Sequence, residues 1–220
     1  IGPVSRALGG TGVAAPQDAI SAVFANPAAM CISPACASAQ VDIAMTLFMP
    51  EVNAGVFAGP FGNYYGASDD SVYTIPALGF SFPVGGDAGR WRVGLSAYGV
   101  SGLGVDYART PIATGNFWGP GAPLTAGFYT NLSIMKIAPS VAYAISPEWS
   151  IGFSGHIDYA TLDLGLGGKN DYGFGGQLGV VWKPVKDFSV GLTYTSPQAT
   201  TFDNVLDFDG NGIIDSLKLE

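Results

Sequence analysis

The chain has 220 residues, of which only 12% are charged, about half the roughly 25% that is usual for soluble domains. Its net charge of -8, with nine Lys and Arg residues, argues against a nucleic-acid partner, which needs a basic footprint. The longest uncharged runs, residues 19–41 and 110–135, are interrupted by prolines and do not qualify as membrane-spanning helices. If the chain lies in a membrane, the remaining possibility is a closed β-barrel. Lipid offers no hydrogen-bond partners, so every backbone N–H and C=O group must be paired within the protein.

The first 37 residues differ from the rest of the chain. They are rich in Ala, Gly and Pro and show no alternation of apolar and polar side chains. A short helical turn is predicted around residues 18–24, and Asp18 is suited to cap it. Cys31 and Cys36 lie close enough in sequence for a disulfide in an oxidising periplasm. The alternative is that they are two unpaired, buried small residues.

From residue 38 onward, apolar and polar side chains alternate with the period of two that is typical of β-strands. In the clearest copy, Trp149 and Phe153 fall on the apolar face, whereas Ser154 and His156 fall on the polar face. Ten tilted strand residues climb about 25 Å, the height of the apolar band of an outer-membrane barrel. The pattern predicts seven antiparallel strands, over residues 39–50, 73–84, 90–100, 131–145, 149–163, 172–183 and 188–196.

The connections between these strands alternate in length. Tight turns follow the second, fourth and sixth strands, and long segments follow the first, third and seventh. Bacterial barrels place short turns on the periplasmic side and long loops outside, so the first strand should run outward and the N-terminal segment should start inside. Such barrels have even strand numbers from eight upward, so seven strands predict the N-terminal half of a larger barrel, spanning residues 38–220 with a long acidic loop at 197–220.

Five stretches of the chain carry a family resemblance: residues 2–12, 18–19, 24–28, 137–143 and 191–197. They resemble the FadL/TodX type of outer-membrane transporter, which carries long-chain fatty acids or aromatic hydrocarbons. In that family the opening segment is a hatch that plugs the barrel, and an Asn-Pro-Ala tripeptide belongs to it. The resemblance therefore implies a hatch over residues 1–37, with Asn26, Pro27 and Ala28 as its tripeptide.

The resemblance also implies an exit for the ligand. In the family, a kinked strand opens a lateral gap in the wall, through which an apolar ligand leaves into the membrane. Pro139 is one candidate for such a kink, because proline removes a hydrogen bond from the strand ladder. The glycine-rich strands supply rival sites.

Four ionisable residues fall on the polar phase of the predicted strands: Arg92, Lys136, His156 and Asp158. The simpler reading is the charged inner wall expected of a porin-like barrel. The alternative is that one of the cations holds a substrate carboxylate through a charge-assisted hydrogen bond. His156 is the only histidine, and no nucleophile or second histidine is placed to form a triad or metal site with it.

The acidic segment near the C-terminus has oxygen donors at the spacing of an EF-hand calcium loop. Asp207, Asp209, Asn211 and Asp215 take the first, third, fifth and ninth positions, and the Ile213 carbonyl takes the seventh. Lys218 stands at the twelfth position, where a bidentate carboxylate is expected, so the site is incomplete as written. Structural calcium and a solvated acidic loop both remain open, and no other cofactor is expected.

The sequence therefore predicts a channel in the bacterial outer membrane for passive uptake of hydrophobic small molecules. Aromatic residues on the long loops would capture the ligand, among them Phe57, Phe61, Phe117 and Trp118. Outer-membrane lipid is the other expected partner, and the barrel is expected to be monomeric. A structural or adhesive barrel without specific transport is the alternative, although it would need no plug. An enzyme is not expected, because His156 has no nucleophile or orienting partner.

Overall fold

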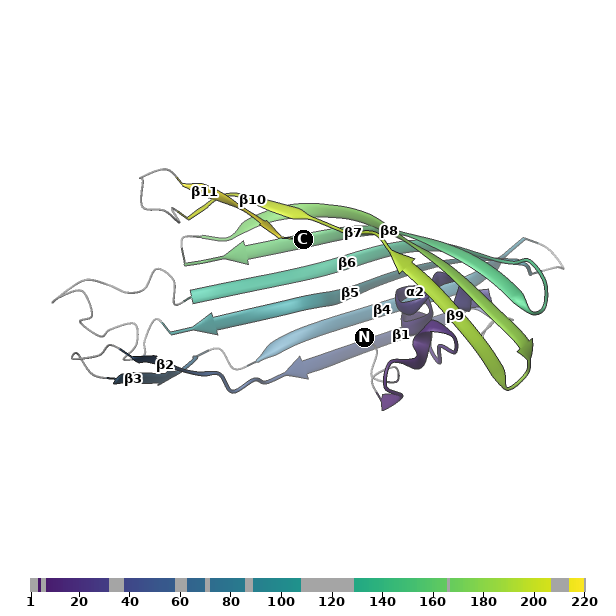
Figure 1. The fold of residues 1–220 in the computed structure, drawn as a ribbon, viewed down its shortest axis with the longest axis horizontal. Coiled ribbons are helices and arrows are strands. Elements are labelled where there is room, and N and C mark those ends of the chain that lie inside the picture. The colour runs from purple at the N-terminus through teal and green to yellow at the C-terminus, as the bar shows by residue number, and fades with distance from the viewer. Residues whose placement is uncertain are drawn as a thin grey trace.

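The computed structural model describes Val4 and residues 7–31, 38–57, 63–69, 72–85, 89–107, 129–165, 167–206 and 214–219. Its main element is a curved, antiparallel, seven-stranded sheet in the order β1-β4-β5-β6-β7-β8-β9 (Figure 1). This sheet confirms the predicted fold class. The strands are β1 (Gln40–Phe48), β4 (Tyr73–Val84), β5 (Trp91–Asp106), β6 (Tyr129–Ala144), β7 (Trp149–Asp163), β8 (Lys169–Val185) and β9 (Phe188–Thr195).

The apolar phase of the strands forms the outer, convex face of the sheet. The five aromatic residues that share this phase are between 39% and 62% exposed: Trp149, Phe153, Tyr172, Trp182 and Tyr194. The rings of Trp149 and Trp182 are stacked, with centroids 5.7 Å apart. The prediction that these side chains lie on the outer surface is therefore confirmed.

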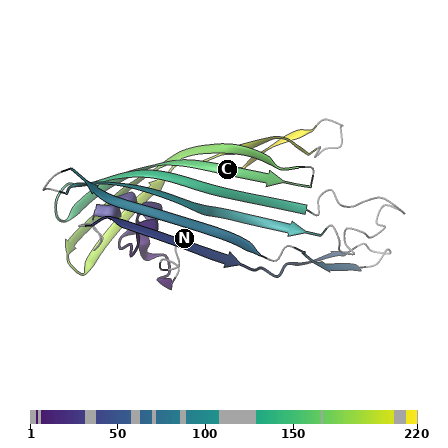
Figure 2. The same ribbon diagram turned by 180° about the vertical axis from the view of Figure 1, so that it is seen from behind.

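The N-terminal segment packs on the opposite, concave face (Figures 1 and 2). It consists of the short helices η1 (Thr11–Val13), α2 (Ala19–Ala25) and η2 (Pro27–Cys31). Asp18 caps α2 as predicted, because its Oδ1 accepts a 2.6 Å hydrogen bond from the Ser21 amide. None of the helices in the described part of the chain is long and apolar enough to cross a membrane.

Two hairpins form where only loops were predicted. One joins β2 (Asn53–Phe57) to β3 (Asn63–Ala67), and the other joins β10 (Thr200–Leu206) to β11 (Asp215–Leu219). Figure 1 places both at the end of the sheet away from α2. Within the predicted long acidic loop, residues 197–220, the described part of the chain is thus largely paired as a hairpin. The reason is burial: Phe202 and Val205 of β10 pack with Ala160 and Leu162 of β7.

The wall of the sheet is interrupted between β4 and β5. Their pairing runs from Val84↔Trp91 to Ala77↔Tyr98, and beyond that point residues 73–76 of β4 pair with none of the described residues of β5. On its other side β5 carries a bulge between Gly99 and Ser101. The register of β6 is the same on either side of Pro139, although Ala138 and Pro139 themselves have no partner on β7, and the break between β4 and β5 lies next to the β5 bulge.

Candidate functional site

The side chain of Asn26 anchors the N-terminal segment to the sheet. Its Nδ2 donates to the carbonyl of Val13 at 2.9 Å, to that of Val180 at 3.1 Å and to that of Leu192 at 3.4 Å. Its Oδ1 accepts a 3.0 Å hydrogen bond from the Ala28 amide. Asn26 is fully buried, so one carboxamide ties together two parts of the segment and the backbones of β8 and β9.

Glycines of the sheet let the segment approach this closely. A Cβ on Gly179 would overlap the Asn26 carboxamide, and one on Gly152 would overlap the backbone of Pro27 and Ala28. A Cβ on Gly191 would likewise overlap the Val13 carbonyl. These three glycines lie on the neighbouring strands β7, β8 and β9, and together they form a groove in which Gly152 and Gly179 face the tripeptide and Gly191 faces Val13.

Polar side chains of the strands complete the contact with the segment. Gln177 donates to the carbonyls of Phe24 and Ala25, both at 3.2 Å, and Ser150 donates to the carbonyl of Ala28 at 2.7 Å. Asp42 of β1 accepts a 2.6 Å hydrogen bond from the amide of Ala19. On the concave face, the segment is therefore hydrogen-bonded to strands near both edges of the sheet, β1 at one edge and β7 and β8 toward the other.

A buried polar cluster lies farther from the tight turns, on β6 and β7. The Nζ atom of Lys136 is 3.2 Å from Asp158 Oδ1 and 3.4 Å from His156 Nδ1, and it also donates to Gln198 Oε1. Gln198 Nε2 lies 2.8 Å from the same His156 nitrogen. Both neighbours of Nδ1 are donors, so Nδ1 accepts and the proton sits on Nε2. The exposed fractions of Lys136, His156 and Asp158 are 8%, 4% and 5%.

Gln198 reaches this cluster because the chain returns over the concave face after β9. We call residues 196–206 the returning segment. The Ser196 hydroxyl accepts a 2.9 Å hydrogen bond from the Gly176 amide, and Asp171 Oδ2 accepts one of 2.6 Å from the Thr201 amide. No sequence pattern had placed this segment beside the polar phase of β7.

The other predicted cation, Arg92, is 1% exposed and lies near the tight-turn end of the sheet. Its Nε donates to the Ser81 hydroxyl at 3.1 Å, and its Nη2 donates to the Ser38 carbonyl at 2.9 Å. All four ionisable residues predicted to face inward are therefore on the concave side and buried. Arg92 and Lys136 both already bind polar groups of the protein. This fits the interpretation as a charged inner wall of the barrel better than the interpretation as a preformed site for a substrate carboxylate.

A cavity of about 170 Å³ opens beside the polar cluster. Its polar walls come from Lys136, Asp158 and the returning segment, and its other walls are apolar. The lining residues are Val100, Ile134, Lys136, Asp158, Gln198, Thr200 and Leu219. The cavity thus lies directly behind the β5 bulge, because Val100 is the residue that the bulge leaves between Gly99 and Ser101.

A larger and more apolar pocket, of about 460 Å³, follows toward the long-loop end. Phe48 shares the strand phase of Asp42, and Thr130 shares that of Lys136, so the pocket opens on the concave face. Its lining residues are Phe48, Pro50, Val52, Tyr73, Gly102, Leu103, Gly104, Val105 and Thr130. It lies beside the stretch where β4 and β5 are no longer paired.

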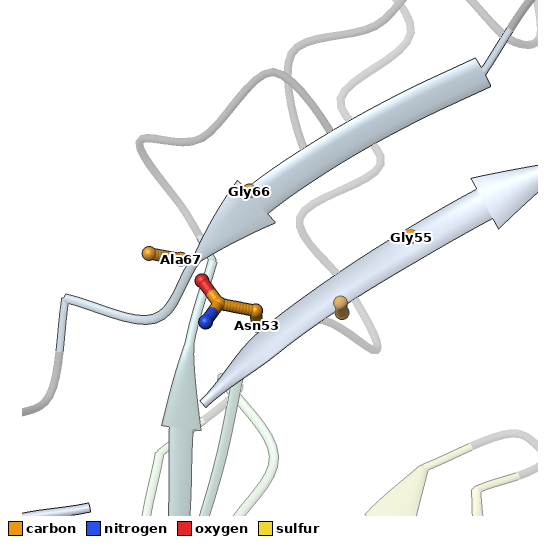
Figure 3. Close-up of a pocket in the computed structure, with 5 residues that line it drawn as sticks. Asn53, Gly55, Gly66 and Ala67 are labelled. Carbon is orange, nitrogen blue, oxygen red and sulfur yellow. The ribbon is translucent and has the colours of Figure 1, made fainter. Parts of the chain in front are cut away.

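A third hollow, of about 540 Å³, lies on the β2–β3 hairpin (Figure 3). It is lined by Asn53, Ala54, Gly55, Gly66 and Ala67. The lining has one side-chain amide and no charged or aromatic group. It therefore offers a ligand little specific contact.

The remaining predicted residues lie mostly outside the described part of the chain. Of the capture aromatics, Phe57 lies on β2, and Phe61, Phe117 and Trp118 fall outside the described residues. Cys31 Sγ lies 3.7 Å from the Arg90 carbonyl, and Cys36 is likewise outside, so their disulfide stays a prediction.

The predicted calcium loop also lies largely outside the described residues. Asp215 begins β11 and pairs with Leu206, so strands rather than the helices of an EF-hand flank this loop. The other four proposed ligands, Asp207, Asp209, Asn211 and Ile213, are not among the described residues, and calcium stays a prediction. Within the described ranges, no three His, Cys, Asp or Glu residues gather closely enough to hold a metal ion.

The family model described as outer membrane protein transport protein (OMPP1/FadL/TodX) matches residues 1–170. The chain belongs to this family. The match confirms the resemblance seen in the N-terminal stretches and the predicted outer-membrane location. The family is one of transport proteins and not of enzymes. A search of the curated proteins gave no significant match.

Solved structures of FadL/TodX proteins share the fold. The toluene transporter TbuX of Ralstonia pickettii has a TM-score of 0.69 at 18% identity, covering 92% of this chain and 59% of TbuX. The toluene transporter TodX of Pseudomonas putida has a TM-score of 0.59 at 16% identity, covering 83% of this chain and 52% of TodX. A Pseudomonas aeruginosa FadL homologue has a TM-score of 0.50 at 16% identity, covering 83% of this chain and 48% of the homologue. The chain thus spans about half to three-fifths of these proteins.

Proposed function

We propose that the protein is an outer-membrane transporter that lets hydrophobic small molecules diffuse inward. The observation that carries this proposal is the apolar pocket of about 460 Å³ on the concave face, at the end of the sheet away from the N-terminal segment. Its volume lies within the roughly 300–1,000 Å³ of small-molecule sites, and such sites are mostly apolar. A hydrophobic ligand that leaves water for this pocket gains the free energy of apolar burial. Long-chain fatty acids and aromatic hydrocarbons are the substrate classes of the proposal.

The N-terminal segment acts in this proposal as the plug at the periplasmic end. It is fastened by the Asn26 carboxamide and by Gln177, so it closes the concave face while the pocket above it stays accessible. A ligand in the pocket therefore needs another way out. The unpaired edge between β4 and β5 supplies it, because opening that edge breaks no strand ladder.

Side chains rather than backbone hydrogen bonds fill this edge. A Cβ on Gly99 would lie 2.8 Å from Ile75 Cγ2, and one on Gly104 would lie 2.5 Å from the Tyr73 hydroxyl. Rotation of the Ile75 and Tyr73 side chains would thus clear a path from the pocket to the lipid. Rotamer changes of this kind take far less time than unpairing a strand.

A removable staple across this edge tests the exit. The added Cβ at Gly99 lies 3.9 Å from Ile75 Cβ, within the range of about 3.5–4.5 Å found in disulfides. Cells that express the intact protein with both Ile75→Cys and Gly99→Cys should take up the hydrophobic probe N-phenylnaphthylamine slowly when oxidised. Treatment with dithiothreitol should restore the uptake rate of the reduced protein.

The two single-cysteine variants are the matched controls, since they share the substitutions and the native Cys31 and Cys36 but cannot form the staple. Their uptake should not respond to dithiothreitol. Fast uptake through the oxidised, stapled protein would rule out the lateral exit. Cells with the unmodified protein that take up no more probe than cells without it would rule out the transport function itself.

A further inference from the structure

The cavity of about 170 Å³ behind the β5 bulge has chemistry that the apolar pocket lacks. An engineered cavity of about 150 Å³ in another protein holds one benzene molecule, so a single ring is the right size of guest. The apolar side chains of Val100, Ile134 and Leu219 suit the body of such a ring. The opposite wall is the carboxylate of Asp158 with its partner Lys136.

The charge on this wall argues against an anionic guest. The ammonium of Lys136 is already engaged, at 3.2 Å from Asp158 Oδ1 and in contact with Gln198 Oε1. A ligand carboxylate could reach Lys136 only beside the Asp158 carboxylate. Two like charges so close together in a buried site repel each other, and removing Lys136 from Asp158 would leave a buried charge unpaired.

The same wall can accept a hydrogen bond from a neutral guest. A carboxylate has about four lone-pair sites, whereas Asp158 has one charged partner, the Lys136 ammonium 3.2 Å from Oδ1, and no further donor to Oδ1 among the described residues. Asp158 lines the cavity and is 5% exposed, so water outside the fold does not satisfy it freely. The Gln198 carboxamide is hydrogen-bonded to both Lys136 and His156, so it is not free to turn and donate to Asp158.

We propose that this cavity is a subsite for an uncharged, one-ring compound whose hydroxyl group donates a hydrogen bond to Asp158. Phenol has the right chemistry, toluene lacks the donor, and benzoate carries the disfavoured charge. The proposal rests on the proposed transport function and narrows its substrates: the subsite favours neutral hydroxylated rings over carboxylates. The apolar pocket lies nearer the long loops and has no such acceptor, so it would contact the rings of phenol, toluene and benzoate without recognising the hydroxyl group.

The test is equilibrium dialysis of labelled phenol, toluene and benzoate against the intact, purified protein in detergent. The unmodified protein should bind phenol more tightly than toluene, and benzoate most weakly. Asp158→Asn removes the negative charge but keeps the shape. The ratio of phenol to toluene affinity should then fall about tenfold, as expected for the loss of one charged hydrogen bond. Benzoate binding should rise, because Lys136 is released.

Asp163→Asn is the matched control, since Asp163 lies on the same strand but does not line the cavity. It should leave the affinity ratio unchanged. If Asp158→Asn does not fold, Leu219→Phe fills the cavity without touching the ion pair and should weaken phenol binding in the folded barrel. Equal affinity for phenol and toluene in the unmodified protein, or phenol binding that Leu219→Phe leaves unchanged, would overturn the subsite.

Failure of this subsite is distinguishable from failure of transport. The uptake of N-phenylnaphthylamine by cells depends on the transport route and involves no hydroxyl recognition. If the probe enters but phenol shows no preference over toluene, only the subsite is wrong. If the probe does not enter either, the transport function is wrong.

Discussion

The carboxamide of Asn26 occupies the space that a β-carbon on Gly179 would fill. From that position its Nδ2 donates to the carbonyl of Val180, the next residue of β8. Neither residue alone explains how the N-terminal segment is held. The asparagine supplies the hydrogen bonds, and the glycine lets its side chain come close enough to the strand to make them.

Gly179→Ala should therefore loosen the N-terminal segment while the strands stay assembled. The added methyl group either displaces Asn26 or strains β8, and overpacking of this kind costs about 1–3 kcal/mol. Limited proteolysis of the protein in detergent should show faster cleavage within residues 7–31. Because the segment acts as a plug in the proposed function, the Gly179→Ala protein in planar bilayers should show more frequent ion-conducting openings than the unmodified protein.

Gly155→Ala is the control for this substitution. Gly155 lies on the neighbouring strand, and an added Cβ there would meet only Pro139 Cγ, at 4.0 Å. Cleavage and conductance should match those of the unmodified protein. A Gly179→Ala protein with an equally protected segment and no added conductance would contradict both the anchor and the plug.

The seven strands of the sheet were predictable because period-two alternation depends only on the local sequence. The pairing of Lys136 with Asp158 was also within reach. The tight turn at residues 145–148 sets the register of the β6–β7 hairpin, and counting outward from it brings these two residues opposite each other. Hairpin register is a local property too.

The returning segment was not predictable in the same way. Gln198 reaches His156 only because the chain folds back after β9, and no local pattern encodes that reversal. The same holds for Gly152, Gly179 and Gly191, which belong to three strands and become a groove only when the strands are in register. Long-range packing decided both features.

The outward face of the β8–β9 hairpin should tolerate charge only near the end of the hairpin, and not in the middle of its strands. Leu178 is 58% exposed in mid-strand, and Phe188 is 53% exposed just after the tight turn into β9. Arginine on the lipid face costs about 2–4 kcal/mol at the bilayer midplane and roughly 0–1 near the interface. Leu178→Arg should therefore lower the free energy of unfolding in lipid bilayers far more than Phe188→Arg.

Urea titrations of the intact protein in liposomes, followed by tryptophan fluorescence, measure this difference. The same two variants in detergent micelles should differ much less, because a micelle deforms around a charge. Equal losses in liposomes would mean that the convex face does not meet the hydrocarbon core at the depth that the strand register implies.

The apolar pocket near the long-loop end should be sensitive to its own volume. Leu103 lines the pocket and is 64% exposed, so it has room for a larger side chain. Leu103→Trp adds about six heavy atoms of mostly apolar bulk to the space that a ligand would occupy, with little strain on the strands. Uptake of N-phenylnaphthylamine by cells should fall severalfold while the amount of folded barrel in the outer membrane stays the same. Leu178→Trp makes the same exchange on the lipid face and should leave uptake unchanged, since an aromatic residue suits that surface. Equal uptake by the two variants would show that the ligand does not pass through this pocket.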